Sequence, residues 1–239
     1  MTKTSKKIYR GTIYTIGMIS LAFGIVLNTK SQLGAAPIAT TPLAVAEMTG
    51  LQFGDLAMGL YIIFAIIEFV IKGKSFKKFD LLQIPFCYLF TRCMNFFSSN
   101  IIFDIHSPWQ SFAIMLVGVL CTGVGVAMSV EMRLVPNPSD GLVQVISDRT
   151  GVKLGLTKNI FDAVCVTIAV SVGLIFAGRV IGVGVGTICA LLGIGRVVAI
   201  FNHLFKDKML KRAFESGDNN KSAKKGKSLE RETAREEAK

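Results

Sequence analysis

The segment "RLVPNPSDGLVQVISDRTG", residues 133–151, is polar and contains two prolines, yet it lies between two long apolar runs. Residues 31–50, "SQLGAAPIATTPLAVAEMTG", resemble a fainter copy of it. In both segments a leucine is followed by a proline-bearing turn, then by roughly ten helix-compatible residues, then by Thr-Gly. Proline is favoured at the first position of a helix, and glycine is favoured in a left-handed cap after its end. Both segments are therefore predicted to be short helices, about 15 Å long at 1.5 Å per residue.

The two segments belong to a longer internal repeat. An offset of 101 residues aligns two glycine pairs, the leucines, the prolines, the Thr-Gly ends, an acidic pair and a third glycine pair: Gly17/Gly118, Gly24/Gly125, Leu33/Leu134, Pro37/Pro138, Thr49-Gly50/Thr150-Gly151, Glu47/Asp148 and Gly54/Gly155. With three more residues inserted, Arg92 aligns with Arg196 and Phe97 with Phe201. Each copy contains a span, a short broken segment and two further spans. Because three is an odd number, the second copy enters the membrane upside down, an architecture that recurs in transporters.

The composition is typical of an integral membrane protein. The chain is 51% hydrophobic and only 18% charged, and its mean hydropathy is +0.52. The net charge of +11 comes from Lys and Arg residues beside apolar runs, so nucleic-acid binding is not predicted. All five cysteines lie in apolar runs, and no metal site, cofactor or catalytic Ser–His or Cys–His pair is predicted. We do not expect an enzyme.

Hydropathy and charge together predict an all-α polytopic membrane protein with six transmembrane helices as two inverted three-helix repeats, each with a short helix. Lys and Arg residues are abundant in alternate connections only, which places both termini in the cytoplasm. The basic N-terminus (1–10) leads into a retained first span rather than a cleaved signal peptide. Repeat 1 covers 11–100, repeat 2 covers 109–205, and a charged cytoplasmic tail covers 206–239. The six predicted spans are 9–29, 55–72, 79–98, 109–130, 156–177 and 180–204.

The sequence leaves open how the two short helices meet the membrane. As re-entrant half-helices, their N-terminal N–H groups at Pro37 and at Asn137, Pro138, Ser139 and Asp140 would favour a polar or anionic solute. As interfacial helices, they would lie flat on opposite surfaces. The charges within residues 139–149 suit a surface helix, and the nearly uncharged residues 37–49 suit a buried one.

Charged residues within spans are costly in lipid and are candidates for function. Arg92 and Arg196 occupy equivalent repeat positions and are predicted to attract the solute from opposite sides of a central cavity. Glu47, Asp162 and Lys158 are candidates for ion coupling or ion pairing. In the alternative interpretation, each arginine pairs with an acid such as Asp162 or Glu47 and only holds helices together.

Five motifs resemble a known family: "GIVLNTKSQLGAAP", "DLLQIP", "NPSDGLVQVISDRTG", "LGLTKNIFD" and "GVGVGTI". Together, over approximately residues 10–204, they are similar to the bacterial YczE/YyaS/YitT-type integral membrane proteins. This resemblance implies a multi-pass protein of the bacterial plasma membrane. It supplies no substrate or catalytic residue that can be carried over to this chain.

The predicted function is transport of a small polar or anionic solute by a transporter or channel, with a site at the repeat interface near the bilayer midplane. The sequence has no nucleotide-binding motif, so transport would be passive, ion-coupled or powered by a partner. Two alternatives stay open: a substrate-binding subunit of a larger importer, and a non-transporting membrane scaffold or accessory protein. The expected partners are the lipid bilayer and the solute, and a homo-oligomer or a partner subunit is not distinguished.

Overall fold

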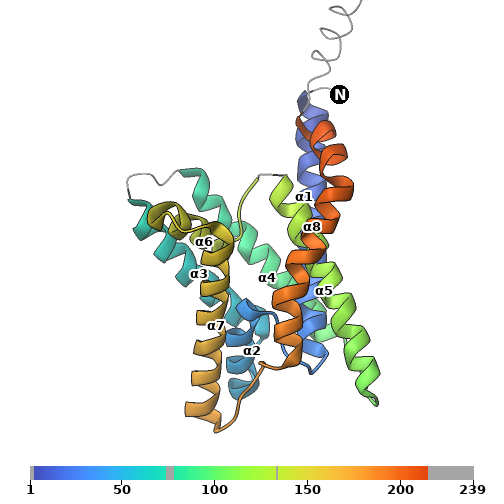
Figure 1. Cartoon of the computed structure of the whole chain (residues 1–239), viewed down its shortest axis with the longest axis vertical. Helices are drawn as coiled ribbons and strands as arrows, with labels where there is room; N and C mark the ends of the chain where they lie inside the picture. The colour runs from blue at the N-terminus through green and yellow to red at the C-terminus, as the bar shows by residue number, and fades with distance from the viewer. Residues whose placement is uncertain (1–2, 74–77, 133, 215–239) are drawn as a thin grey trace, which may run out of the picture.

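The computed structural model describes residues 3–73, 78–132 and 134–214, which are helical over most of their length. A short 3-10 helix, η2 (Lys78–Leu82), precedes α4. The α-helices are α1 (Lys3–Lys30), α2 (Pro37–Thr49), α3 (Phe53–Lys72), α4 (Gln83–Asn100), α5 (Pro108–Glu131), α6 (Pro138–Thr150), α7 (Leu154–Ala177) and α8 (Val185–Phe214). The all-helical prediction is confirmed for these residues (Figure 1).

Among the described residues, five helices are long and apolar enough to cross a membrane: α1, α3, α5, α7 and α8. Large apolar side chains such as Ile66, Ile175 and Ile188 lie on their outer surfaces, as expected for faces in contact with lipid. The shorter α4 has 18 residues and carries Arg92 and several polar side chains, which explains why it is not among the five. The structure thus describes a multi-pass helical membrane protein.

The two short helices begin and end where the sequence predicts. α2 and α6 each have 13 residues, begin at a proline and end at a threonine. The cap residues Gly50 and Gly151 have φ angles of 72° and 71°, and their N–H groups bond back to the carbonyls of Ala46 and Ser147. In Figure 1, α6 lies at the upper end of the left-hand group of helices, and α2 lies in the lower half of the same group.

α1 and α5 pack closely through glycines. A Cβ atom at Gly24 would lie 2.4 Å from the backbone nitrogen of Thr122, and one at Gly125 would lie 2.5 Å from the backbone nitrogen of Leu21. The two contacts are equivalent in the repeat: Gly24 corresponds to Gly125, and Leu21 corresponds to Thr122, at an offset of 101 residues. Small residues allow this close approach of two membrane helices.

The last long helix begins later than the sequence predicts. The expected span 180–204 begins as a loop, and α8 starts only at Val185. The N–H of Ala35 donates to the carbonyl of Gly182, and the N–H of Gly186 donates to that of Leu33, at 2.8 and 2.7 Å. The apolar Gly182–Gly186 run therefore packs against the loop before α2. A Cβ at Gly184 would lie 2.4 Å from the Leu33 carbonyl oxygen, so the lack of a side chain at Gly184 allows this close packing.

α1 and α8 extend together beyond the other helices at the top of Figure 1. Their 28 and 30 residues correspond to about 42 and 45 Å, longer than the roughly 30 Å hydrocarbon core. The Arg10 guanidinium donates to the Met132 carbonyl at 2.8 Å and lies 4.5 Å from the centre of the Phe214 ring. Residues 206–214 of the predicted tail are thus part of α8, and the rest of the tail lies outside the described residues.

The packing of the last two helices of each repeat differs. α3 packs along α4, whereas α7 and α8 share no comparable interface within the part of the chain that the structure describes. Figure 1 shows α7 and α8 in separate lobes. Other helix pairs match between the repeats: α2 packs on α7 as α6 packs on α3, and α1 packs on α4 as α5 packs on α8. The α3–α4 pair is therefore closed, whereas the equivalent α7–α8 pair of the second repeat is open.

Candidate functional site

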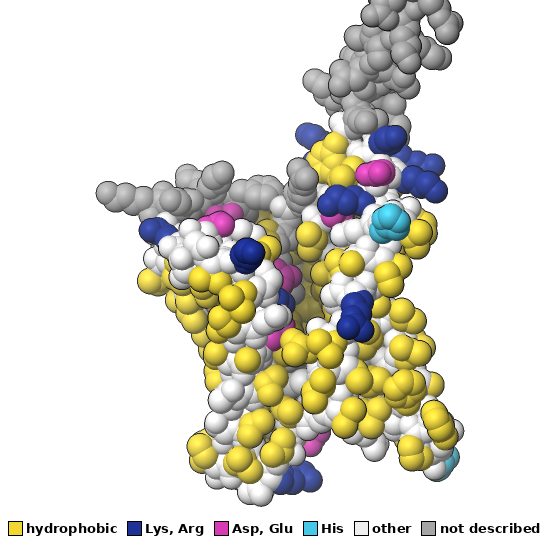
Figure 2. Space-filling model, in the orientation of Figure 1, with side chains coloured by type: hydrophobic (Ala, Val, Ile, Leu, Met, Phe, Trp, Pro, Cys, Tyr) yellow, Lys and Arg dark blue, Asp and Glu magenta, His cyan; other side chains and the backbone are white. Residues whose placement is uncertain are grey.

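A cavity of about 850 Å³ lies between the two lobes, on the side of the molecule that carries α6. Its wall includes parts of α1, α3, α4, α5, α6 and α7, with Val198 from α8. Most of the lining side chains are apolar or aromatic, and Figure 2 shows acidic and basic side chains in the hollow between the lobes. Cavities of this size and character hold small molecules in many proteins.

One charged cluster of the cavity joins α6 and α7. The Lys158 ammonium lies 3.0 Å from an Asp162 carboxylate oxygen and 3.8 Å from an Asp140 carboxylate oxygen. The Asp162 side chain is 10% exposed, whereas that of Asp140 is 43% exposed. Lys158 therefore pairs with two carboxylates, and its contact with the more exposed one, Asp140, is the longer.

A second cluster joins α3 and η2. The Lys72 ammonium lies 2.6 Å from a Glu68 carboxylate oxygen and 3.1 Å from an Asp80 carboxylate oxygen. The Glu68 side chain is fully buried and lies against Gly141, where an added Cβ would approach the carboxylate to 2.8 Å. The absence of a side chain at Gly141 thus makes room for Glu68 beside the first turn of α6.

The N-terminal turn of α6 is already surrounded by the protein's own negative charge. Asp140 lies in this turn, and the Glu68 carboxylate lies beside it. Because a helix N-terminus attracts anions, the two carboxylates occupy the place beside this turn that an anionic solute would take. The predicted preference of this helix end for an anionic solute is therefore not favoured by the geometry.

Four of the predicted site residues lie in or beside this turn. Asn137, Pro138 and Asp140 line the cavity. The Asn137 side chain caps α6 by accepting from the Ser139 backbone N–H at 3.4 Å, and Ser139 itself is buried. Pro37, at the start of α2, is buried and does not line this cavity. The structure thus brings the residues of the second short helix together with Lys158 and Asp162, without those of the first.

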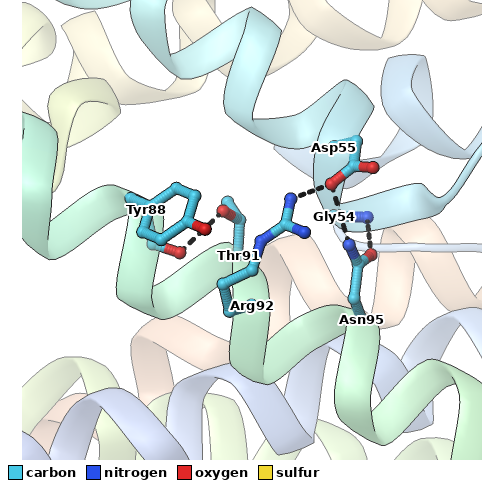
Figure 3. Close-up of polar contacts among 6 residues, drawn as sticks. All are labelled: Gly54, Asp55, Tyr88, Thr91, Arg92 and Asn95. Carbon is cyan, nitrogen blue, oxygen red and sulfur yellow. Dashed lines mark hydrogen bonds and ion pairs between the residues drawn. The ribbon is translucent and has the colours of Figure 1, made fainter.

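Arg92 lies in a different contact, between α3 and α4 (Figure 3). Its guanidinium forms an ion pair with Asp55, and the Asn95 side-chain amide donates to the same carboxylate at 2.9 Å. The Gly54 backbone N–H in turn donates to the Asn95 side-chain oxygen at 2.6 Å. Arg92 therefore joins the middle of α4 to the first turn of α3 and does not line the cavity.

Arg196 and Glu47 are both exposed and also lie outside the cavity lining. Across residues 3–73, 78–132 and 134–214, Arg196 has no hydrogen-bond or ion-pair partner. The two arginines consequently do not meet at a central site, and the acid that pairs with Arg92 is neither Asp162 nor Glu47.

Sequence reasoning gave no role in the site to three of the important charged residues, Glu68, Lys72 and Asp55, and noted Glu68 only as a charge near the end of a span. Glu68 and Lys72 are four residues apart on one helix, as are Lys158 and Asp162, and this spacing is the signal of an ion pair on one helix face. Asp55 is 37 residues from Arg92, and no local spacing indicates their contact. Only the position of Asp55 in the first turn of α3 marks it as a residue of structural interest.

Comparison with known proteins assigns the chain to a family. A model of a family of unknown function, DUF6198, matches residues 8–203, most of the chain. The chain belongs to the DUF6198 family. It is also similar to the uncharacterized protein YyaS of Bacillus subtilis (strain 168), with 22% identity over 188 residues, covering 79% of this chain and 90% of YyaS. This confirms the resemblance to YyaS-type proteins. No solved structure matches this DUF6198 chain.

Proposed function

We propose that this protein carries a small polar solute across the bacterial inner membrane, by exposing the cavity alternately to the two sides. The proposal includes six spans in two inverted repeats, with both termini in the cytoplasm. α4 is the sixth span: its 18 residues extend about 27 Å, and its packing against α1 and α3 shields part of its polar surface from lipid.

The observation that carries the proposal is the unequal packing at equivalent positions. A Cβ at Gly54 would lie 2.3 Å from the Thr91 carbonyl oxygen, so α3 and α4 touch there. In the second repeat, Gly155 and Gly195 occupy the positions equivalent to Gly54 and Thr91. A Cβ at Gly155 or at Gly195 would meet nothing within 4 Å. The same contact is therefore closed in the first half of the chain and open in the second.

Two arrangements of one repeated unit within one molecule support a cycle in which the halves exchange arrangements. Closing α7 against α8 would bring Gly155 to Gly195 and cover the cavity on the α6 side. Separating α3 from α4 would open the cavity on the α2 side. Inverted repeats with a site at their interface achieve alternating access in this way.

Cross-linking tests the closed form of the second half. Leu156 and Ala199 are the repeat counterparts of Asp55 and Asn95, whose side chains touch at 2.9 Å. We expect Leu156→Cys with Ala199→Cys, in a background without the five native cysteines, to be joined by a short bis-methanethiosulfonate reagent in membranes. The matched control is Leu156→Cys with Ile200→Cys, because the neighbouring side chain points about 100° away around α8.

The two cysteine pairs give opposite expectations. A cross-link at least tenfold faster for the Ala199 pair than for the Ile200 pair would support alternate closure. Equal rates for the two pairs, or no cross-link in either, would mean that the second half does not adopt the arrangement of the first, and the transport proposal would be abandoned.

The closed contact of the first half offers a second prediction. Asp55→Asn removes the charge partner of Arg92, and partly exposed ion pairs contribute about 0.2–1 kcal/mol. We expect α3 to separate from α4 more often, so that a cysteine at the buried Thr91 position reacts with a thiol reagent up to about fivefold faster. Glu47→Gln, which alters an exposed acid of α2, should leave the rate unchanged. A rate unaffected by Asp55→Asn would show that the ion pair does not hold this contact closed.

A further inference from the structure

The acidic and basic groups around the cavity do not balance. Four carboxylates line the cavity or pair with Lys158, which lines it: Glu68, Asp140, Asp148 and Asp162. The bases that line it are Lys72 and Lys158. A third base, Arg149, is exposed and donates to the carbonyl of Ile71. Even with Arg149 included, these four carboxylates exceed the three bases by one negative charge.

The excess is most accessible at Asp140. Lys158 is closer to Asp162 than to Asp140, at 3.0 against 3.8 Å, so the Asp140 carboxylate keeps free acceptor positions. The Asp140 carboxylate is 43% exposed and faces the largely apolar cavity, where an ammonium group could reach it.

The rest of the wall suits an organic cation better than a bare ion. Tyr14, Phe86 and Phe90 line the same cavity, and the rings of Tyr14 and Phe86 pack edge to face at 5.4 Å between centroids. Aromatic faces attract ammonium groups. A divalent metal would instead require about six oxygen ligands, and among the described residues no group of three or more His, Cys, Asp or Glu side chains is placed to hold one.

We propose that the cavity takes an organic cation, a solute that carries an ammonium group on an apolar body, with Asp140 as the carboxylate that receives the ammonium and the aromatic wall receiving the body. This assignment deepens the proposed function, since it names the chemical class of the solute for the same cavity. It differs from the small polar or anionic solute expected from the sequence.

Three probes with the same aromatic body test the assignment on the purified full chain in lipid nanodiscs: phenethylammonium, 2-phenylethanol and phenylacetate. Isothermal titration calorimetry should give a dissociation constant for phenethylammonium at least tenfold below that for 2-phenylethanol, and no binding of phenylacetate. This comparison uses the unaltered protein, so it does not depend on the folding of a variant. Equal affinities for the three probes, or a preference for phenylacetate, would overturn the proposal.

The role of Asp140 is tested by substitution. Asp140→Asn should weaken phenethylammonium binding at least tenfold and leave 2-phenylethanol binding unchanged, whereas Glu47→Gln should change neither. Full affinity for phenethylammonium in Asp140→Asn would remove Asp140 from the site.

The outcomes separate this inference from the transport proposal. If phenethylammonium binds selectively but the Leu156/Ala199 cysteine pair does not cross-link, the cation site stands and transport fails. If the pair cross-links but phenylacetate is preferred, transport stands and the organic-cation assignment fails.

Discussion

Replacing Lys72 by methionine is expected to lower the free energy of unfolding by about 3 kcal/mol, because it leaves a buried carboxylate without its partner. Glu68 is fully buried, and the Lys72 ammonium lies 2.6 Å from it. Lys72 also pairs with Asp80, so the substitution removes the centre of a three-residue cluster. Thermal unfolding in detergent, followed by circular dichroism, measures the loss.

The double variant Glu68→Gln/Lys72→Met is the matched control. It removes both charges and keeps side chains of similar volume, so most of the stability should return. If the single and double variants unfold at the same temperature, the buried charge of Glu68 is not what Lys72 compensates.

Gly24→Ala is expected to destabilise the protein by about 3 kcal/mol, the upper part of the range for overpacking a close contact. The new methyl carbon would lie 2.4 Å from the Thr122 backbone nitrogen and 2.7 Å from the Gly118 carbonyl oxygen. Backbone atoms cannot rotate away as a side chain can, so α1 and α5 would have to separate. Gly125→Ala should have a similar effect, because it makes the reciprocal contact.

Gly11→Ala is the control on the same helix. A Cβ at Gly11 would meet nothing within 4 Å, and alanine is a better helix former than glycine. Gly11→Ala should therefore leave the unfolding temperature unchanged or slightly higher. Equal unfolding temperatures for Gly24→Ala and Gly11→Ala would show that the α1–α5 contact is looser than the structure indicates.

Local signals in the sequence predicted the short helices well. Pro37 and Pro138 begin α2 and α6, and Gly50 and Gly151 end them, because these residues restrict or permit backbone conformations on their own. The repeat offset aligned Gly24 with Gly125, and the structure places both glycines in the α1–α5 contact. These features depend on a few adjacent residues or on internal similarity, and both are visible in one sequence.

Features that depend on distant contacts were not predictable. The apolar run after Arg179 has the hydropathy of a span, yet hydrogen bonds to the loop at Leu33 and Ala35 keep it in a loop as far as Gly184. Asp55 finds Arg92 only when α3 packs along α4. The cavity likewise depends on how far α7 stands from α8, and no residue spacing specifies that distance.

The solitary position of Arg196 implies that the two ends of the proposed cycle differ in energy. Arg92 has Asp55 as its counter-ion, but the repeat places Leu156 where Arg196 would need one. Closing the second half would exchange a satisfied arginine for an arrangement in which no carboxylate replaces Asp55. Each 1.4 kcal/mol of that difference shifts the two populations about tenfold. Without solute, the protein should therefore keep its cavity accessible from the α6 side. A bound solute would have to supply the free energy for the change to the other arrangement.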